Sequence, residues 1–382
     1  MFADTHVCLV SEQPTPNITP VLDPAVAPRR VILIVSPDME QRAKWLEAVL
    51  KPRSILVERW TIDDPWDVEH IEARVLELLD REQPGRLALN ATGGTKPMSI
   101  AAYREFRDAN APIFYVHPYE DRVIWLHPKG RESVALADRI KLEPFLMAHG
   151  ATVGEGIDRS QPDRALLDIA GDLVRDVATL GEALKVLNRL AGQAERNGLC
   201  SQDRLPEGRR DAWSLAERFA VADLLTIDHG RLRFPCEEAR FFVNGGWLEL
   251  YAFQSVQRLH AKTRPVQDLG RAIRVERLIR SKPVRNELDV AVLSDNRLYL
   301  IECKTRSWGL GQVPDPGADA LYKLDSLADL LGGLQARTML LSFQDLPDRD
   351  RRRAGELRIA VCAGAELLRL QEILSRWLPI AA

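Results

Sequence analysis

Hydrophobic residues in the first third of the chain gather into short runs separated by amphipathic stretches. Six of these runs predict strands, at 7–10, 31–35, 55–57, 87–89, 113–116 and 123–126. Between them, apolar residues recur at helical spacing over 43–50, 71–79 and 97–106. Continuous apolar strands that alternate with helices are typical of a mostly parallel, doubly wound sheet. We therefore predict an α/β unit in residues 1–150.

The pattern changes twice beyond this unit. Gly150 to Gly156 is a glycine-rich break that predicts a linker. Helical periodicity over 161–200 and 212–225, followed by a hairpin at 224–232, predicts a small helical, winged-helix-like connector over 151–240. A second α/β unit is expected over 241–382. Its predicted helices are 247–259, 318–331 and 365–378, and its predicted strands are 272–279, 287–293, 298–303, 338–343 and 357–362.

Composition narrows the class of protein. The 382 residues are 46% hydrophobic and 28% charged, as in ordinary globular proteins. With 52 basic and 55 acidic residues the net charge is −3, so any nucleic-acid binding requires a local basic patch. Five cysteines without a Cys-x-x-Cys pair argue against a disulfide scaffold or zinc site and favour a reducing cytoplasm. The sequence has no recognisable signal peptide or apolar run of membrane-spanning length, so we expect a soluble, cytoplasmic protein without a membrane partner.

Acidic and basic residues gather on two predicted strands of the last unit. Glu287 and Asp289 precede a turn at Ser294-Asp295-Asn296, and Glu302 and Lys304 follow it, which predicts an antiparallel hairpin. Strand alternation places Glu287 with Asp289 and Glu302 with Lys304. The opposite, apolar faces would carry Leu288, Val290, Ile301 and Cys303.

This hairpin would bring Asp289 and Glu302 close enough to share a divalent cation. Hard oxygen ligands without a Cys or His companion suit Mg²⁺ or Mn²⁺. Lys304 would add a fixed positive charge that positions water or stabilises charge in a transition state. The alternative is a solvated hairpin whose charges face water, but the ordered positions on the predicted face favour a site.

A helix carboxylate precedes these strands, Glu249 in Gly245-Gly246-Trp247-Leu248-Glu249. A helix Glu, then Asp, then Glu-x-Lys resembles the PD-(D/E)xK nucleases, although their Pro-Asp is replaced by Leu288-Asp289. The resemblance implies a restriction-endonuclease-like fold and a metal-dependent endonuclease. In it, the metal ligands would be Asp289, Glu302 and the Cys303 carbonyl. Lys304 would assist catalysis and Glu249 would complete the site.

A local basic patch before the hairpin favours a nucleic-acid substrate, DNA or RNA or both. Nine basic residues oppose Asp268 and Glu276 between 257 and 285, for a local charge of +7 (nine minus two). They are Arg258, Lys262, Arg264, Arg271, Arg274, Arg277, Arg280, Lys282 and Arg285. Such groups neutralise phosphates without reading sequence. Three residues have two open interpretations. Glu287 is either an auxiliary metal ligand or a surface residue, and Tyr322 and Lys323 are either phosphate contacts or ordinary helix surface.

The loop Thr92-Gly93-Gly94-Thr95-Lys96 joins a predicted strand to a predicted helix. Paired glycines let a ligand approach the backbone closely, and a helix N-terminus favours phosphate. The Walker A and dinucleotide fingerprints are both missing, so ATP hydrolysis and nicotinamide chemistry are not supported.

Together with Val10-Ser11-Glu12-Gln13 and Pro16-Asn17, this loop resembles the CARF (CRISPR-associated Rossmann fold) sensors. The resemblance implies a Rossmann-like homodimer that binds cyclic tetra-adenylate across its two-fold axis. The implied ligand contacts are Ser11, Gln13, Thr92, Gly93, Gly94, Thr95 and Lys96. A CARF sensor followed by a PD-(D/E)xK domain is similar to the ancillary nucleases of type III CRISPR systems, which cut nucleic acid once the ligand reshapes the dimer.

Two other functions stay open at this point. A ligand-responsive transcription regulator would use the sensor and the winged-helix-like segment, and Glu302→Ala would leave it unaffected. A ring nuclease would degrade the cyclic signal in the sensor and would depend on Lys96 rather than Lys304. A restriction-type nuclease without a signal is disfavoured because it leaves the first unit without a role.

Overall fold

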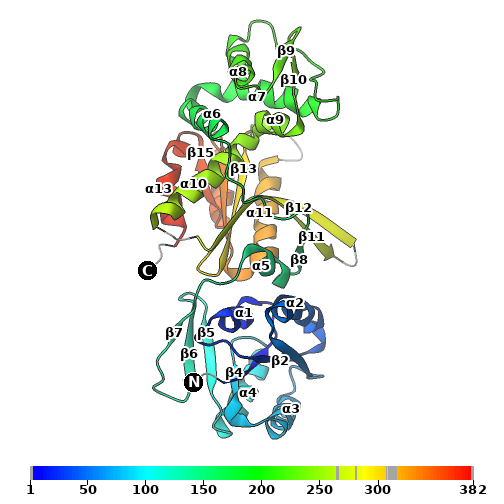
Figure 1. The fold of residues 1–382 in the computed structure, drawn as a ribbon, viewed down its shortest axis with the longest axis vertical. Helices are drawn as coiled ribbons and strands as arrows, with labels where there is room; N and C mark the ends of the chain where they lie inside the picture. The colour runs from blue at the N-terminus through cyan, green and yellow to red at the C-terminus, as the bar shows by residue number, and fades with distance from the viewer. Residues whose placement is uncertain (1–2, 264–265, 280–281, 307, 309–315, 380–382) are drawn as a thin grey trace.

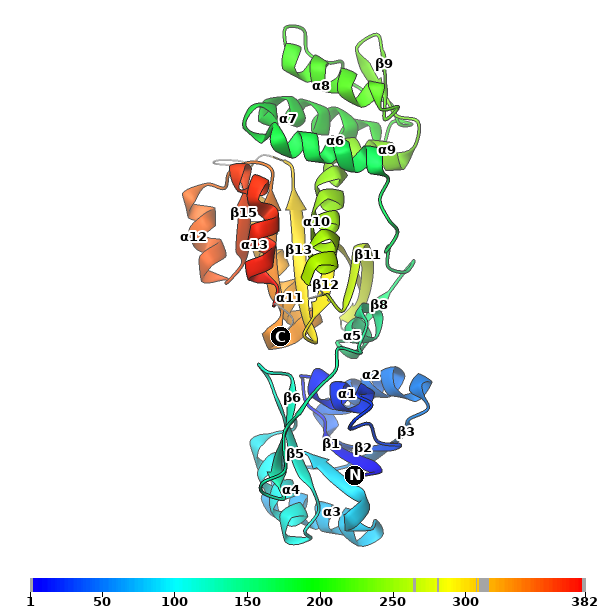
Figure 2. The same ribbon diagram turned by 60° about the vertical axis from the view of Figure 1, so that its left-hand side comes forward.

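The computed structural model describes residues 3–263, 266–279, 282–306, 308 and 316–379. The chain forms two α/β units and a helical segment along one long axis (Figures 1 and 2). Residues 151–240, expected as a connector, join the two units along the sequence. In space, however, the helices from α6 (Arg164–Arg175) to α9 (Glu237–Phe241) pack at the end of the second unit that is remote from the first (Figure 1).

The first unit is built on a seven-stranded sheet with the order β3-β2-β1-β4-β5-β6-β7. Its strands are β1 Thr5–Leu9, β2 Arg30–Val35, β3 Leu56–Thr61, β4 Leu87–Asn90, β5 Ile113–His117, β6 Arg122–His127 and β7 Val134–Ala135. Its helices are α1 Thr15–Leu22, α2 Glu40–Leu50, α3 Val68–Arg81 and α4 Lys96–Asp108. Strands β1 to β5 pair in parallel, which confirms the predicted Rossmann-like class.

The switch point of this sheet lies at β1, because the chain adds β2 and β3 on one side of β1 and then crosses over to add β4 and β5 on the other side. Ligands bind such sheets in the crevice at the carboxyl ends of the strands that flank the switch point. The loops after β1 and β4 border this crevice. They are the two loops that the sequence singled out.

The stretch Gly150 to Gly156 is not a free linker, contrary to the prediction. Helix α5 (Leu142–Ala148) is followed by β8 (Ala151–Val153), which pairs antiparallel with β11 at the edge of the second sheet. Ala151 is buried, and Gly150 adopts φ 83° against the ring of Trp45 in α2. A strand this short has too few residues to show alternation in the sequence.

The helical segment differs from its prediction at one point. Residues 161–200 form two helices, α6 Arg164–Arg175 and α7 Val177–Ala194, instead of one. The break falls at Asp176, whose φ and ψ of −89° and 15° end the first helix. Helix α8 (Arg210–Val221) and the hairpin of β9 (Thr226–Asp228) and β10 (Arg231–Arg233) follow as expected.

The second unit contains a six-stranded sheet with the order β15-β14-β13-β12-β11-β8. Its remaining strands are β11 Asp268–Ile279, β12 Lys282–Ser294, β13 Arg297–Lys304, β14 Arg337–Ser342 and β15 Ala360–Ala363. Its helices are α9 Glu237–Phe241, α10 Trp247–Thr263, α11 Pro316–Gly332, α12 Asp348–Glu356 and α13 Leu370–Trp377, with a π-helical turn over Phe242–Gly246. No helix among the described residues has the length and apolar character to cross a bilayer.

Two hydrophobic cores cover the two faces of the second sheet. One face packs on α10 and α13 and on the helical segment, through residues such as Val290 and Ile301. The other packs on α11 and α5, and this core continues into α1 and α2 of the first unit. The two units therefore share one hydrophobic core on this side.

The predicted alternation of β12 fails at one residue. Leu288 and Val290 were expected on one face, but Leu288 packs in the core that contains α5 and Val290 in the core that contains α10. The β11–β12 ladder skips the pair formed by Ala272 and Asp289, and Ala272 has a φ of 48°. Because of this local kink, side chains of β12 before and after Asp289 that would share one face in a regular strand point to opposite faces of the sheet.

The hairpin between β12 and β13 closes through Asp295 and Asn296, whose φ values are 52° and 51°. Two residues with positive φ are the signature of a type I′ hairpin turn, and the antiparallel hairpin itself is the one that the sequence predicted. The turn lies toward the first unit (Figure 2). Glu302, six residues after Asn296, is then about 20 Å away along the strand.

Candidate active site and ligand cavity

The acidic and basic residues of the hairpin meet where β13 ends beside the middle of β12. Val290 pairs with Ile301, so Asp289 and Glu302 occupy the next positions on the two strands. The Cys303 amide donates a hydrogen bond to Asp289 Oδ2 (2.7 Å). Lys304 Nζ forms an ion pair with Glu302 Oε1.

These groups shift each other's ionisation. Burial, and then the charge of Glu302, raise the pKa of Asp289 to about 7. Burial raises the pKa of Glu249 well above its ordinary value, and Asp289 adds to the effect. Burial opposes the charged form of Lys304, yet Glu302 and Asp289 leave its pKa raised. The raised pKa favours the ammonium form of Lys304 at neutral pH.

A cavity of about 510 Å³ opens beside Lys304. The π-helical turn positions one wall: Gly245 has a φ of 121°, and a Cβ there would overlap the Thr305 hydroxyl. That hydroxyl also accepts a hydrogen bond from Asn188 of α7 (3.1 Å). Besides Gly245, Gly246 and Ala320, the lining residues are Phe241, Asn244, Glu249, Cys303, Lys304, Thr305, Arg306 and Trp308.

Phe241 and Arg306 were not expected at this site. For Phe241 the signal in the sequence was the Gly245-Gly246 pair, because the ring lies over Gly246. Trp308 lines the cavity but donates through Nε1 to Ser342 Oγ (2.9 Å) and packs against the core, so it contributes to packing.

Glu287 faces a different cavity, of about 520 Å³, together with Lys323 and Arg285. Tyr322 is 51% exposed and lies under the guanidinium of Arg353 (5.7 Å). Glu287 and Lys323 therefore share one surface beside the hairpin, whereas Tyr322 points elsewhere on α11.

The basic patch is partly paired, and Asp158 and Glu155, which lie outside the counted window, lower its local charge. Acidic residues from distant segments or the neighbouring strand neutralise three of its arginines. The ion pairs are Arg271–Asp158 (2.7 Å), Arg274–Glu155 (2.6 Å) and Arg285–Glu276 (2.8 Å). Arg264 and Arg280 lie outside the described residues.

The second cavity, also about 510 Å³, lies at the switch point of the first sheet. Of the seven predicted ligand contacts, five line it: Ser11, Gln13, Thr92, Gly93 and Gly94. The other two do not. Thr95 caps α4 by accepting from the Met98 amide (3.2 Å), and Lys96 is the exposed first residue of that helix.

Hydrogen bonds hold the two loops of this cavity in place. Thr92 Oγ1 donates to Asn90 Oδ1 (2.6 Å) and accepts from the Val116 amide (2.8 Å). A Cβ on Gly93 would overlap the Leu9 carbonyl oxygen, so the loop after β4 lies directly on the end of β1. The result is a backbone-lined recess between these two strands.

The second unit closes the same cavity from the opposite side. Its contributions are Asp295, Asn296 and Arg297 of the β12–β13 turn and Gly332, Leu334 and Gln335 after α11. The side chain of Gln13 lies against Gly333. This cavity therefore contacts both α/β units.

Two family models match the chain, the Card1 CARF domain over residues 5–145 and the Card1-like endonuclease domain over residues 236–381. The structure of protein VC1899 from Vibrio cholerae is 32% identical, with a TM-score of 0.88, and the match covers 98% of this chain and 97% of that one. This chain belongs to the Card1-like family. It is a nuclease with a CARF domain.

Two further structures resemble this Card1-like chain. Can2 from Sulfobacillus thermosulfidooxidans, solved in complex with cyclic tetra-adenylate, is 26% identical (TM-score 0.82; 98% of this chain, 99% of that one). A type III CRISPR defence DNA nuclease activated by cyclic oligoadenylate is 21% identical (TM-score 0.53; 90% and 45%) and shares the fold. Among curated proteins no match was found.

In this Card1-like nuclease, Asp289→Asn is expected to raise the melting temperature at pH 8 in EDTA while abolishing activity. A carboxyl whose pKa is raised by folding costs stability above that pKa, because the fold disfavours its ionised form. Asn keeps an acceptor for the Cys303 amide and removes the charge. Each kcal/mol relieved adds about 2–4 °C. The control is Asp168→Asn, at an exposed position of α6. An unchanged or lower melting temperature for Asp289→Asn would contradict a raised pKa of Asp289 in the folded protein.

Proposed function

We propose that this chain is a divalent-cation-dependent nuclease that cyclic tetra-adenylate switches on through the cavity at the switch point of the first sheet. The observation that carries the proposal is the pairing of two sites in one chain: a Glu-x-Lys strand end beside a cavity, and a recess under the Thr92–Gly94 loop. The likeness to Can2, solved with cyclic tetra-adenylate, supports the ligand.

The residues at the strand ends fit a hard cation. Asp289 and Glu302 offer carboxylate oxygens, and the Cys303 carbonyl offers a third oxygen ligand. The pKa of Asp289 is raised because its carboxyl is buried close to the negative charge of Glu302. Asp289, Glu302 and Glu249 do not form a group with all oxygens within 4.8 Å; among the described residues Asp121, Asp138 and Asp295 do. When bound, Mg²⁺ or Mn²⁺ would supply an activated water and neutralise charge on the scissile phosphate.

Side chains around the cavity would bind the nucleic acid and stabilise charge during cleavage. Lys304, held by Glu302, donates from Nζ toward the cavity and stabilises negative charge that develops on the phosphate. Glu249 completes the rim on the α10 side. Arg306 adds a second cation for the nucleic-acid backbone, and the exposed ring of Phe241 offers a stacking surface for a base.

Activation by a cyclic ligand favours a homodimer. A symmetric ring presents the same atoms to each subunit, so two copies of the Thr92–Gly94 loop can bind it across a two-fold axis. Thr95 and Lys96, which lie outside the cavity of one chain, would then be ligand contacts only through the partner or after rearrangement. Ser11, Gln13, Thr92, Gly93 and Gly94 are the contacts within one chain.

The test is cleavage of supercoiled plasmid and of single-stranded RNA in Mn²⁺, with and without cyclic tetra-adenylate, and in EDTA. We expect cutting that requires both the cation and the ligand. Ligand binding without cleavage of either substrate would favour a regulator. Disappearance of the ligand without cleavage of nucleic acid would favour a ring nuclease. Cutting that ignores the ligand would contradict the sensor.

A further inference from the structure

The nuclease domain supplies the positive charge of the ligand cavity. Among the lining residues that the structure describes, the one Lys or Arg is Arg297, the first residue of β13. The CARF side contributes backbone, hydroxyl and amide groups, together with Glu12 and Asp121. An anionic ligand in this cavity therefore finds its opposite charge on the domain that cuts.

The guanidinium of Arg297 forms an ion pair with Asp295 of its own domain (3.4 Å) and also contacts the CARF domain. Its Nη2 donates to the carbonyl oxygens of Pro118 (3.2 Å) and Tyr119 (2.7 Å) in the β5–β6 turn. Gln335, after α11, donates to the same Pro118 carbonyl (2.8 Å). Asn296 donates to the Asp121 carboxylate. The nuclease domain thus holds the CARF turn at residues 118–121 with four hydrogen bonds.

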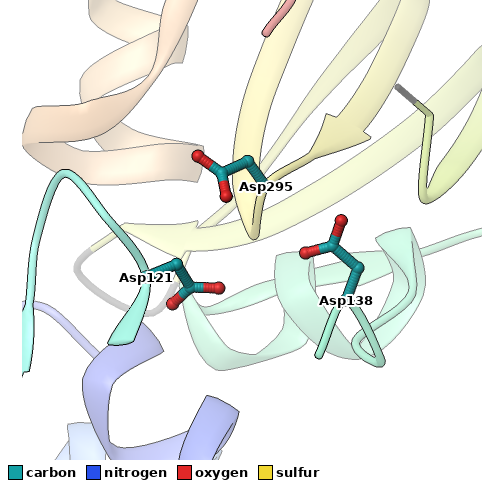
Figure 3. Close-up of side chains that lie close together, drawn as sticks. All are labelled: Asp121, Asp138 and Asp295. Atoms are coloured by element: carbon teal, nitrogen blue, oxygen red, sulfur yellow. The ribbon is translucent and has the colours of Figure 1, made fainter. Parts of the chain in front are cut away.

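Carboxylates surround this contact. Asp121, Asp138 and Asp295 come from the β5–β6 turn, the segment before α5 and the β12–β13 turn (Figure 3). Burial raises the pKa of Asp121 to about 7 and raises that of Asp138, and Asp295 adds to both shifts. Three carboxyl groups at one junction weaken the contact between the domains, because their like charges repel. The hydrogen bonds of Arg297, Gln335 and Asn296 oppose this repulsion.

We propose that Arg297 binds a phosphate of the cyclic oligonucleotide and thereby transmits occupancy of the cavity to the nuclease domain. This inference rests on the proposed function. A phosphate carries a full negative charge and can accept two parallel hydrogen bonds from a guanidinium, so it competes with the Pro118 and Tyr119 carbonyls. When Arg297 binds the phosphate instead of the two carbonyls, the CARF turn at residues 118–121 loses these hydrogen bonds. Repulsion among Asp121, Asp138 and Asp295 then favours separation of this turn from the β12–β13 turn.

Strand β13 connects Arg297 directly to the candidate active site. β13 runs from Arg297 to Lys304 and is hydrogen-bonded on both sides, to β12 and β14. A paired strand moves as a unit, so a shift at its first residue reaches Glu302 and Lys304 at the other end. The ligand can drive this shift only through its different affinity for the two arrangements, and Arg297 supplies that difference. Arg297 is a positioning residue for catalysis.

The experiment compares the full-length protein with Arg297→Ala, Arg297→Lys and Gln335→Ala. The control is Arg337→Ala, at an exposed residue whose guanidinium reaches the neighbouring Ala336 carbonyl (3.4 Å). Affinity for cyclic tetra-adenylate is measured by calorimetry, and plasmid cleavage in Mn²⁺ is measured across ligand concentrations. Melting curves identify any variant that fails to fold.

We expect Arg297→Ala to weaken ligand binding about 10- to 100-fold, and to lower the maximal stimulation at saturating ligand. Arg297→Lys retains part of the affinity, Gln335→Ala retains the affinity but changes the stimulation, and Arg337→Ala matches the unchanged protein. Full affinity and full stimulation of Arg297→Ala overturn the inference. Weakened binding with full stimulation at saturation overturns the transmission step. Failure of the unchanged protein to bind the ligand refutes the proposed function instead.

Discussion

Glu302→Gln should reduce activator-dependent cleavage by more than about 100-fold while leaving ligand binding intact. Loss of groups that merely support a metal ligand already costs about 10- to 100-fold, and Glu302 is itself a proposed ligand. The amide oxygen of Gln still accepts a hydrogen bond from Lys304, so the buried cation keeps a partner. Plasmid cleavage in Mn²⁺ at saturating cyclic tetra-adenylate measures the loss.

The matched control for this substitution is Glu356→Gln, at an exposed position at the end of α12. It removes the same charge from the same domain without approaching the hairpin. Equal affinity of both variants for the ligand, measured by calorimetry, shows that the sensor is intact. Cleavage by Glu302→Gln at more than about a tenth of the unchanged rate would exclude Glu302 as a metal ligand.

Gly93→Ala should raise the ligand concentration needed for activation about 10- to 100-fold. The added Cβ overlaps the Leu9 carbonyl oxygen and comes within 3.2 Å of Ser11 Oγ, so the loop must move away from β1. Such overpacking costs about 1–3 kcal/mol, which corresponds to a roughly 10- to 100-fold weaker ligand affinity if the native loop is the binding conformation. The readout is the ligand concentration that gives half-maximal cleavage.

Gly85→Ala is the control, because a Cβ at Gly85 meets no atom within 4 Å and its φ is not positive. It tests the cost of replacing a glycine in the same domain without disturbing the loop. Melting temperatures separate a displaced loop from an unfolded domain. If Gly93→Ala is folded and activated at the same ligand concentration as the unchanged protein, the Thr92–Gly94 loop is not the sensor.

The longer strands and the β12–β13 hairpin were predictable because their signals are local. The run Val31 to Val35 is apolar on both faces, as buried parallel strands require, and the turn residues Asp295 and Asn296 tolerate the positive φ that a two-residue hairpin needs. Helix α1 was not predicted, because Pro16 and Pro20 fall within eight residues. Pro16 fits the first turn of a helix, and burial of Ile18 and Val21 outweighs the low propensity of Pro20.

The candidate active site was visible for the same reason, since Asp289 and Glu302 share one hairpin. What the sequence could not reveal are contacts between distant segments. Glu155 lies 119 residues from Arg274, whose charge it neutralises, so a count within a window overstates the basic patch. Arg297 and Pro118 are 179 residues apart, and their contact exists only because the two units pack together.

Strand β8 has a consequence for how such proteins can evolve by exchange of parts. Residues 151–153 belong to the β-sheet of the endonuclease, although they precede its other strands by more than a hundred residues and directly follow the CARF domain. A recombination that joined a new sensor at residue 236 would leave β11 as an unpaired edge, and exposed edges of this kind recruit other chains. The unit that can be inherited intact therefore begins before β8 and includes the whole helical segment.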